Sequence, residues 1–387
     1  MPSERKPCVC IFSALYLPTV GGVETYTANL AKALRDLDYR VIVATLNSQE
    51  LAARESSDGI DVVRFPCRAF LGGRYPVSRR NAEYRELRSW LQSQTIDYVI
   101  VNTRFYLHSY AGLSFSRSKG IAPVLIEHGS AHLTMGNPLI DKGVECVEHL
   151  VTAAGKRFNA SYYAVSKKAS AWLEHFGLTS CGELYNAIDA DAYLNQASAR
   201  PFKDELDIPE TDLIVAFVGR MVPEKGVQAI AEAASMLGND RNVTFLLAGG
   251  GPLFDEMRKR SSEKLHLLGK LSPHDVSALL AQADLFCLPS RSEGFATSLL
   301  EAAACYTPSI VTDVGGVDEL IPDNRFGTVI ENAEPQTVAE AVRQAAEHRE
   351  ELAAMGTCVG ELVRAEFSWK KTAERAIEAC KAAQLSD

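Results

Sequence analysis

Residues 213 to 235 read LIVAFVGRMVPEKGVQAIAEAAS, a stretch that decides the kind of fold we expect. It begins with an unbroken apolar run, which is typical of a strand buried on both faces of a sheet. A loop containing Pro223 and Gly226 follows, and beyond it small and apolar residues recur with helical spacing. A buried strand that leads through a loop into a helix is the repeating unit of a parallel α/β sheet.

The same unit recurs on both sides of this stretch, with helical patterns between short apolar runs. We therefore predict an α/β protein with two Rossmann-like, doubly wound parallel-sheet domains that face a central cleft, where ligands bind by default. The expected strands are CVCIFSA (8–14), RVIVATL (40–46), DVVRF (61–65), DYVIVN (97–102), PVLIEHG (123–129) and YYAVS (162–166), then LIVAFVGR (213–220), VTFLLAGG (243–250), LHLLG (265–269), DLFCLPS (284–290), PSIVTDV (308–314) and GTVIE (327–331).

Chain length agrees with two domains, because 387 residues are too many for one ordinary core. The polar stretch LNQASARPF marks the boundary, which gives an N-terminal domain of residues 1–195 and a C-terminal domain of residues 196–367. Residues 368–387 form a helical segment after the second sheet is complete. This segment is free to pack back on the N-terminal domain.

Composition and charge exclude several classes of protein. The chain is 47% hydrophobic and 23% charged, which is a globular composition, and its net charge of −9 makes nucleic acid an unsuitable partner. No apolar run approaches the ~20 residues that cross a bilayer, and the N-terminus lacks a signal-peptide cleavage pattern. We expect a cytoplasmic protein whose contact with a membrane would be peripheral, at the inner face of the plasma membrane.

Metal and disulfide chemistry are not expected from the cysteine pattern. The nine cysteines are scattered and odd in number, and no CxxC pair or Cys/His cluster has the spacing of a zinc site. Buried reduced thiols explain them, because free cysteine packs as a small apolar residue. We expect no metal site.

Two loops after expected strands suit an anionic ligand. Gly21 and Gly22 lack Cβ atoms and would let a phosphate approach the start of a helix, although a tight turn explains them equally well. Arg220 and Lys225 follow another strand, and two converging cations suit a diphosphate. The alternative is a pair of solvated surface cations.

Two further loops follow strands of the second half. AGGGP, at 248 to 252, again lets backbone approach a ligand, but Phe254 stands where a dinucleotide fingerprint needs glycine. In SRSEGFATSLLEAAA, at 290 to 304, Glu293 lies in a loop and Glu301 lies in a helix that we expect to begin near Ala296. Eight helical residues leave two positions within ~80° of each other, so both carboxylates can face one elongated ligand.

Three chemistries could use this pair of carboxylates. A glycosidase needs two carboxylates ~5 to 9.5 Å apart, but the neighbouring glycines and cations would then have no role. A carboxylate metal site needs more oxygen ligands than this segment offers. A sugar nucleotide uses all four loops, with phosphates at a helix start and carboxylates that accept hydrogen bonds from sugar hydroxyls.

Taken together, and in their order along the chain, the motifs resemble the retaining GT-B glycosyltransferases of family 4. This large family has an E-x7-E motif and includes mannosyl-, glucosyl- and N-acetylglucosaminyl-transferases. Any one motif alone is weak, but together they span nearly the whole chain. They are GGVE (21–24), EHG (127–129), NAIDADAY (186–193), GRMVPEKG (219–226), AGGGP (248–252), PSRSEGFATSLLEAAA (289–304) and GGVDELI (315–321).

The resemblance implies roles for particular residues. Glu293 would bind hydroxyls of the transferred sugar, Glu301 the ribose, and His128 would lie beside the donor sugar. Arg220 and Lys225 would neutralise the diphosphate. Further donor contacts would come from Gly21, Gly22, Gly250, Lys270, Leu271, Gly294, Phe295, Ala296, Thr297 and Ser298, with the nucleotide base held mainly by backbone at Gly250, Lys270 and Leu271.

Two features qualify the match. Ala296 replaces the glycine that the family commonly has after Glu-Gly-Phe, which adds a methyl group where the donor approaches. Asp189 and Asp191 have the DxD form of metal-dependent glycosyltransferases, but they fall in the stretch that resembles the family's hinge segment. We expect a shaping role for them and no metal.

The resemblance further implies transfer with retention of anomeric configuration and without a required cofactor. We expect the donor to be a UDP-sugar, with a GDP-sugar as the alternative, and the acceptor to be a glycan or lipid-linked hydroxyl of cell-surface polysaccharide or glycolipid synthesis. Three other classes stay open: a nucleotide-sugar 2-epimerase of the same fold, a nicotinamide oxidoreductase, which the missing fingerprint disfavours, and a non-catalytic sugar-nucleotide-binding protein.

Residues 68–90 form a basic segment that could contact an anionic membrane. Arginines at 68, 74, 79, 80, 85 and 88 alternate with Phe70, Leu71, Tyr75, Leu87 and Trp90. Such a segment suits an anionic lipid surface or a lipid diphosphate acceptor. A solvated helix face is an equal alternative.

Overall fold

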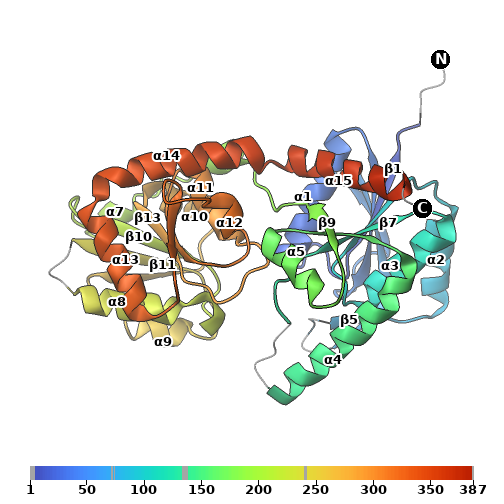
Figure 1. Cartoon of the computed structure of the whole chain (residues 1–387), viewed down its shortest axis with the longest axis horizontal. Helices are drawn as coiled ribbons and strands as arrows, with labels where there is room; N and C mark the ends of the chain where they lie inside the picture. Colours follow the sequence, from blue (N-terminus) through green and yellow to red (C-terminus); the bar gives the residue numbers. More distant parts are fainter. Residues whose placement is uncertain (1–4, 71–72, 74, 133–137, 239–241, 386–387) are drawn as a thin grey trace. The chain divides into compact units, whose positions relative to one another are not determined.

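The computed structural model describes residues 5–70, 73, 75–132, 138–238 and 242–385. The chain divides into two compact units (Figure 1). Unit 1 comprises Met1–Asn186 and Trp369–Asp387, and unit 2 comprises Ala187–Ser368. Each unit has a parallel sheet with helices in the crossovers, so the predicted pair of Rossmann-like α/β domains is confirmed.

The sheet of unit 1 has the strand order β3-β4-β2-β1-β6-β7-β8-β9. Its central pairs, β1 with β2 and β1 with β6, are parallel, and β1 is fully buried. Apolar strands form here because both faces of the sheet are covered. The elements are β1 Cys8–Phe12, α1 Gly22–Asp36, β2 Arg40–Asn47, β3 Arg54–Ser57, β4 Ile60–Phe70, β5 Tyr75–Ser78, α2 Ala82–Ser93, β6 Tyr98–Asn102, α3 Leu107–Lys119, β7 Pro123–Glu127, α4 Pro138–Gly155, η2 Lys156–Phe158, β8 Ser161–Ala164, α5 Lys167–Glu174, β9 Ser180–Glu183 and α15 Trp369–Leu385.

The antiparallel strands β3 and β5 were not predicted. Both pair with β4, which continues past the predicted end of its strand at residue 65. The sequence of β3 is RESS and every residue in it is exposed, while β5 contains Pro76. An edge strand with one solvated face needs no apolar run, so the pattern that reveals buried strands does not reveal these two.

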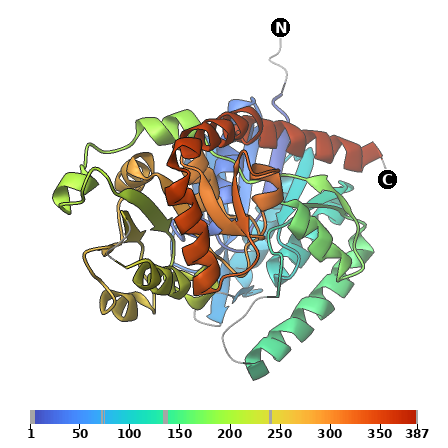
Figure 2. The same ribbon diagram turned by 60° about the vertical axis from the view of Figure 1, so that its left-hand side comes forward.

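Helix α15 packs on helix α1 of unit 1 (Figures 1 and 2). Trp369 meets Tyr26 edge to face with ring centroids 5.4 Å apart, and the Thr372 hydroxyl donates to the Tyr185 carbonyl oxygen at 3.1 Å. Small residues on one face of the helix, including Ala373 and Ala376, are fully buried. The end of the chain therefore completes the core of the unit in which the chain begins.

The sheet of unit 2 has the order β12-β11-β10-β13-β14-β15, and all its pairs are parallel. Counted along the unit, this is the Rossmann order 3-2-1-4-5-6, whose direction reverses between β10 and β13. The elements are α6 Ala190–Asn195, α7 Phe202–Glu205, β10 Leu213–Val218, η3 Pro223–Lys225, α8 Val227–Leu237, β11 Val243–Ala248, α9 Phe254–Arg258, β12 Leu265–Gly269, α10 Pro273–Gln282, β13 Leu285–Leu288, α11 Thr297–Ala304, β14 Ser309–Thr312, α12 Val317–Leu320, β15 Gly327–Ile330, α13 Pro335–Glu347 and α14 Arg349–Glu366.

The division between the units falls between Asn186 and Ala187, ahead of the expected boundary at residue 195. Helix α6, which the sequence assigned to the first domain, packs on α10, α11 and α14 of unit 2. The Ser277 hydroxyl donates to the Tyr193 carbonyl oxygen at 2.6 Å, which fixes that packing. In the part of the chain that the structure describes, no helix is long and apolar enough to span a membrane.

Candidate functional site

The loops at the carboxyl ends of β10, β11 and β12 hold one another through backbone contacts. A Cβ atom on Gly249 would lie 1.8 Å from the Gly219 carbonyl oxygen, so this position admits only glycine. The Met221 amide donates to the Gly250 carbonyl oxygen at 2.9 Å, and the Gly249 amide donates to the Gly269 carbonyl oxygen at 2.7 Å. Loops of adjacent strands are therefore fixed relative to one another.

Close backbone contacts of the same kind also join the loops that follow β13 and β14 to their neighbours. Gly226 has a φ of +68°, and a Cβ atom there would lie 2.1 Å from the Pro289 carbonyl oxygen. A Cβ atom on Gly315 would lie 2.3 Å from the Gly294 carbonyl oxygen. The sequence suggested that the AGGGP loop makes room for a ligand, but Gly249 in that loop makes room for a neighbouring loop, as Gly226 and Gly315 also do.

Lys225 and Glu293 meet where the strand order of unit 2 reverses. Lys225 ends the short helix η3 after β10, and Glu293 lies in the loop after β13. The Lys225 Nζ atom donates to Glu293 Oε1 at 2.5 Å, and the Ser290 hydroxyl donates to the same oxygen at 2.8 Å. Their side chains are 20% and 12% exposed, so this ion pair is partly shielded yet accessible. In open α/β sheets this reversal point is where ligands bind.

The backbone of the Glu293 loop is held as firmly as its carboxylate. The Gly315 amide donates to the Glu293 carbonyl oxygen at 3.2 Å, and the Thr312 hydroxyl donates to the Ser290 carbonyl oxygen. Both contacts come from β14 or the loop behind it. The position of the carboxylate is therefore set by two adjacent strands.

Glu301 lies inside helix α11, which begins at Thr297, one residue after the predicted start. Burial raises the pKa of Glu301 to about 7, although the Tyr193 hydroxyl donates to the carboxylate and Lys225 is close enough to oppose the shift. Tyr193 on α6 was not identified from the sequence, because its contact with Glu301 depends on how α6 packs. Lys225 thus influences both carboxylates of the E-x7-E pair.

The start of helix α11 offers fewer free amides than predicted. The Ala296 amide donates to the Gly315 carbonyl oxygen at 3.0 Å, and the Ala296 side chain is 1% exposed. Its methyl group therefore packs inward. Phe295 is also buried, with its ring centroid 6.0 Å from that of Phe367. No side chain caps the helix, so amides of its first turn, at exposed Thr297 and buried Ser298, remain the candidates for an anion.

The other predicted residues of unit 2 lie on the same edge of the sheet. Arg220 is exposed directly after β10, and Lys270 is exposed directly after β12, with half-buried Leu271 beside it. A Cβ atom on Gly250 would approach the Lys270 side chain to 3.0 Å, so these two residues are neighbours. Arg220 and Lys270 are cations that a ligand at this edge could reach.

In unit 1, His128 follows β7 and is held by a chain of polar contacts. The Asn102 Nδ2 amine donates to the Thr27 hydroxyl at 2.7 Å, which leaves Asn102 Oδ1 to accept from His128 Nε2 at 3.1 Å. Burial lowers the pKa of His128 to about 3, and the Tyr26 ring stands edge-on at 4.7 Å. The assigned form is neutral imidazole, with the proton on Nε2 and the lone pair on Nδ1.

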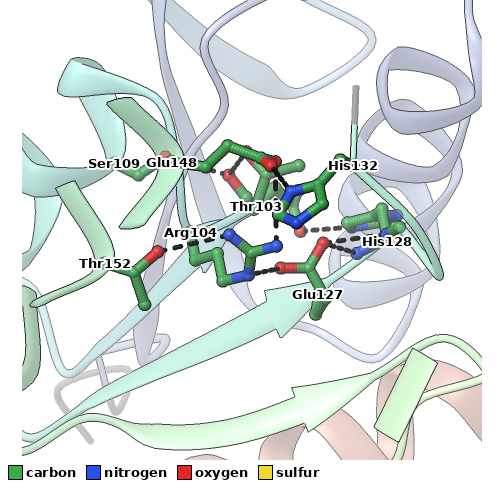
Figure 3. A network of polar contacts seen from close by, with 10 residues as sticks. Thr103, Arg104, Ser109, Glu127, His128, His132, Glu148 and Thr152 are labelled. Atoms are coloured by element: carbon green, nitrogen blue, oxygen red, sulfur yellow. Dashed lines mark hydrogen bonds and ion pairs between the residues drawn. The ribbon is translucent and has the colours of Figure 1, made fainter. Parts of the chain in front are cut away.

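A buried ion pair lies directly behind His128 (Figure 3). Arg104 Nε lies 2.8 Å from Glu127 Oε2, and both side chains are at most 2% exposed. Glu127 Oε1 accepts hydrogen bonds from the amides of His128 and Gly129, at 2.9 and 2.8 Å. Burial raises the pKa of Glu127 against the opposing effect of Arg104. The sequence marked the EHG motif but missed this pair, because Arg104 lies on a separate loop.

The start of helix α1 differs from its predicted form. A Cβ atom on Gly21 would lie 2.3 Å from Glu24 Oε2, whereas one on Gly22 would meet nothing within 4 Å. Glu24 is 8% exposed, burial raises its pKa, and it accepts a hydrogen bond from its own amide. A carboxylate of the chain itself thus lies at the helix start where the sequence suggested a phosphate.

The basic segment 68–90 spans parts of β4, β5 and α2. Its arginines at 68, 79, 80 and 85 are exposed, as is half of Phe70, whereas Leu87 is buried and the Tyr75 hydroxyl donates to the Phe105 carbonyl oxygen. Trp90 stacks under Arg54 at 5.0 Å. Leu71 and Arg74 lie outside the described residues. Most of the apolar side chains expected to contact lipid are therefore engaged within the unit.

Two Rossmann-like units in one chain have the architecture of the GT-B fold, and the second sheet carries cations and carboxylates at its carboxyl edge. The model of Glycosyltransferase Family 4 matches residues 20–192, and that of Glycosyl transferases group 1 matches residues 199–358. The chain belongs to the family 4 glycosyltransferases, which use nucleotide sugars.

Individual relatives agree with this assignment, and a solved structure shares the fold. An uncharacterized glycosyltransferase of Methanocaldococcus jannaschii is 24% identical over 93% of this chain and 94% of its own length. A GDP-mannose-dependent phosphatidylinositol monomannoside mannosyltransferase of Corynebacterium glutamicum is 23% identical over 97% of both chains. HepE of Anabaena, solved with UDP and glucose, shares the fold with a TM-score of 0.71 and 18% identity, over 97% of this chain and 100% of HepE.

Proposed function

We propose that this protein transfers a hexose or N-acetylhexosamine from a UDP-sugar to a hydroxyl acceptor, with retention of anomeric configuration and without a metal or other cofactor in the donor site. The observation that carries the proposal is the Lys225–Glu293 pair at the reversal point of the unit 2 sheet. A cation and a carboxylate held together there can serve the phosphate and the sugar of one donor.

The protein would recognise both ends of the donor, the ribose and the transferred sugar. Glu301, whose pKa is near 7, accepts hydrogen bonds from the ribose hydroxyls, and Glu293 accepts them from the transferred sugar. When the diphosphate enters, it shares the Lys225 ammonium with Glu293, while Arg220 supplies a second cation and the α11 amides supply donors. Charge on the leaving diphosphate is then neutralised by protein groups.

The reaction would proceed on one face of the sugar. The leaving diphosphate oxygen takes the proton of the incoming hydroxyl, the acceptor oxygen bonds to the anomeric carbon, and the bond from that carbon to the phosphate oxygen breaks. Lys225 and Arg220 stabilise the charge that develops on the phosphate. His128, a neutral imidazole with its lone pair on Nδ1, accepts a hydrogen bond from a hydroxyl of the donor sugar.

Relatives support a nucleotide sugar but differ in its base. HepE is solved with UDP-glucose, whereas the mannosyltransferase of Corynebacterium glutamicum is named as GDP-mannose-dependent. Several relatives are named for phosphatidylinositol acceptors, including an N-acetylglucosaminyltransferase subunit of Arabidopsis thaliana, 26% identical over 89% of this chain and 75% of its own length. We therefore propose a lipid-linked or glycan hydroxyl as acceptor.

Peripheral contact with an anionic membrane would use the exposed arginines 68, 79, 80 and 85. Liposome sedimentation at low salt tests this contact. Binding to vesicles with anionic lipid, weakened in a variant with these four arginines changed to glutamine, supports it. Equal recovery in the supernatant with anionic and neutral vesicles contradicts it.

A thermal-shift panel of UDP-, GDP- and ADP-sugars tests the donor. A donor at ~100 times its dissociation constant stabilises the folded protein by ~2.7 kcal/mol, so the cognate base should stand out. The expected result is a shift with a UDP-sugar that disappears in Glu301→Gln. A rise in melting temperature with GDP-sugars alone would show that the donor is a GDP-sugar and not a UDP-sugar.

Assays of the donor without an acceptor distinguish the remaining classes of protein. Slow hydrolysis of the donor without acceptor is expected of a transferase and would exclude a non-catalytic binding protein. Conversion of the donor to an epimeric nucleotide sugar without acceptor would instead identify a 2-epimerase.

A further inference from the structure

Three histidines of unit 1 come together beside the polar network of His128. His132 follows β7, His149 lies on α4, and His175 is the C-terminal cap of α5. One ring nitrogen of each lies within 4.8 Å of those of the other two, and the ring centroids are 5.1 to 5.7 Å apart. His132 and His149 are half-buried, and His175 is exposed, so solvent reaches the cluster from one side.

A buried carboxylate orients one of these rings. Glu148, which is 1% exposed, accepts a hydrogen bond from His132 Nδ1. The proton of a neutral His132 is thereby placed on Nδ1, and its Nε2 presents a lone pair. Metal-binding histidines very commonly donate their second nitrogen to a carboxylate in this way.

Aromatic side chains surround the three rings. Trp172 stacks parallel on His175 at 4.7 Å, and Phe176 meets His132 and His149 with ring centroids 5.8 and 4.8 Å apart. This shell holds the imidazoles close together. The alternative is that the three imidazole rings belong to an aromatic cluster that binds no ligand.

We propose that His132, His149 and His175 form a binding site for a divalent transition-metal ion such as Zn²⁺. Imidazole is a preferred ligand of such ions, and three histidines with an open fourth position are an established donor set for zinc. Binding would require the three ring nitrogens, which lie within 4.8 Å of one another, to approach one ion at the ~2.1 Å bonding distance. Glu145 is a candidate for the fourth ligand, because its Oε1 lies 3.8 Å from His132 Nε2.

The site is linked by contacts to the loop that carries His128 (Figure 3). Glu148 Oε1 lies 3.7 Å from Arg104 Nη2, and Arg104 pairs with Glu127, which holds the His128 and Gly129 amides. A metal ion would therefore tie the loop after β7 to α4 and α5. It would act on the position of this loop and not on the transferred sugar.

Titration of tag-free, chelator-treated protein with Co²⁺ and Zn²⁺ tests the site. We expect one ion per chain, visible absorption bands of a nitrogen-bound Co²⁺ that Zn²⁺ displaces, and a higher melting temperature with either metal. His175→Gln and His149→Gln should each weaken binding at least ~10-fold, since each removes one of three ligands. His266→Gln, in unit 2, is the matched control and should bind like the wild type.

Glu148→Gln gives a further readout, because it keeps the shape of the side chain while removing the charge behind His132. It should lower metal affinity ~10- to 100-fold. Absence of saturable Co²⁺ binding by the wild type, or equal binding by His175→Gln, His149→Gln and wild type, overturns the proposal in favour of an aromatic cluster. Melting curves of the metal-free variants separate loss of ligand from loss of fold.

Discussion

Each unit has an ion pair at the carboxyl ends of its parallel strands, but the two pairs differ in their exposure to solvent. In unit 2, Lys225 and Glu293 keep 20% and 12% of their side chains exposed, and Arg220 is in solvent. In unit 1, Arg104 and Glu127 are at most 2% exposed, and the residue in front of them, His128, is neutral. An accessible ion pair can exchange partners with a charged ligand, whereas a buried pair can only hold the backbone. Unit 2 thus offers charge to a ligand, and unit 1 offers shape and hydrogen bonds.

The largest effect is expected from breaking the buried pair. Arg104→Leu leaves Glu127 uncompensated in the core and should lower the free energy of unfolding by ~3 to 5 kcal/mol. Chemical denaturation measures this change. Arg35→Leu, which removes an exposed ion pair with Asp36, is the control and should cost less than ~1 kcal/mol. Equal effects of the two substitutions would contradict the structural role of Arg104.

Lys225→Ala tests the accessible pair. It should lower kcat ~10²- to 10³-fold, equivalent to ~2.7 to 4 kcal/mol, because the developing charge on the diphosphate loses one of the two cations proposed to neutralise it. The melting temperature should change little, since Lys225 is partly solvated. Lys203→Ala removes a surface lysine that pairs with Glu210 and should retain full activity. Normal turnover by Lys225→Ala would refute the proposed mechanism.

Glu301→Gln tests a pH dependence that follows from burial. The folded pKa of Glu301 is raised from 4.5 to about 7, so the charged form is disfavoured in the folded state. Wild-type stability is therefore fully retained below pH ~4.5 and is lost relative to the Gln variant as the pH rises through 7. The variant should exceed the wild type by ~3 kcal/mol at pH 8, because a rise in pKa from 4.5 to about 7 corresponds to ~1.4 kcal/mol per unit. Unfolding curves from pH 4.5 to 8 measure this difference, and a gap independent of pH would contradict it.

The smallest effect is expected at Ala296. Because its methyl group is buried, Ala296→Gly should leave the KM for the donor within about twofold of the wild type. Stability should change by less than ~1 kcal/mol, since the loss of a buried methyl group is opposed by the better N-cap that glycine makes. A several-fold change in KM would show that the methyl group contacts the donor after all.

Sequence periodicity predicted the two parallel sheets, because each buried strand or amphipathic helix has a characteristic pattern of apolar residues within its own segment. It also marked Lys225, Glu293 and Glu301, because each lies in a loop or helix that follows an apolar strand. It missed Tyr193 beside Glu301, since that contact depends on the packing of α6. It misread Gly249 of the AGGGP loop, because the missing Cβ atom of Gly249 makes room for the Gly219 backbone after a neighbouring strand.

The sequence by itself thus determined the α/β architecture and the residues at the strand ends. Only the tertiary structure decided which of them meet, because the order of strands in a sheet is set by crossovers that leave no local pattern. The histidines at 132, 149 and 175 show this most plainly, because they come from the loop after β7, from α4 and from the C-terminal cap of α5. Their spacing indicated no metal site, yet the packing of α4 and α5 against the loop after β7 brings their ring nitrogens together.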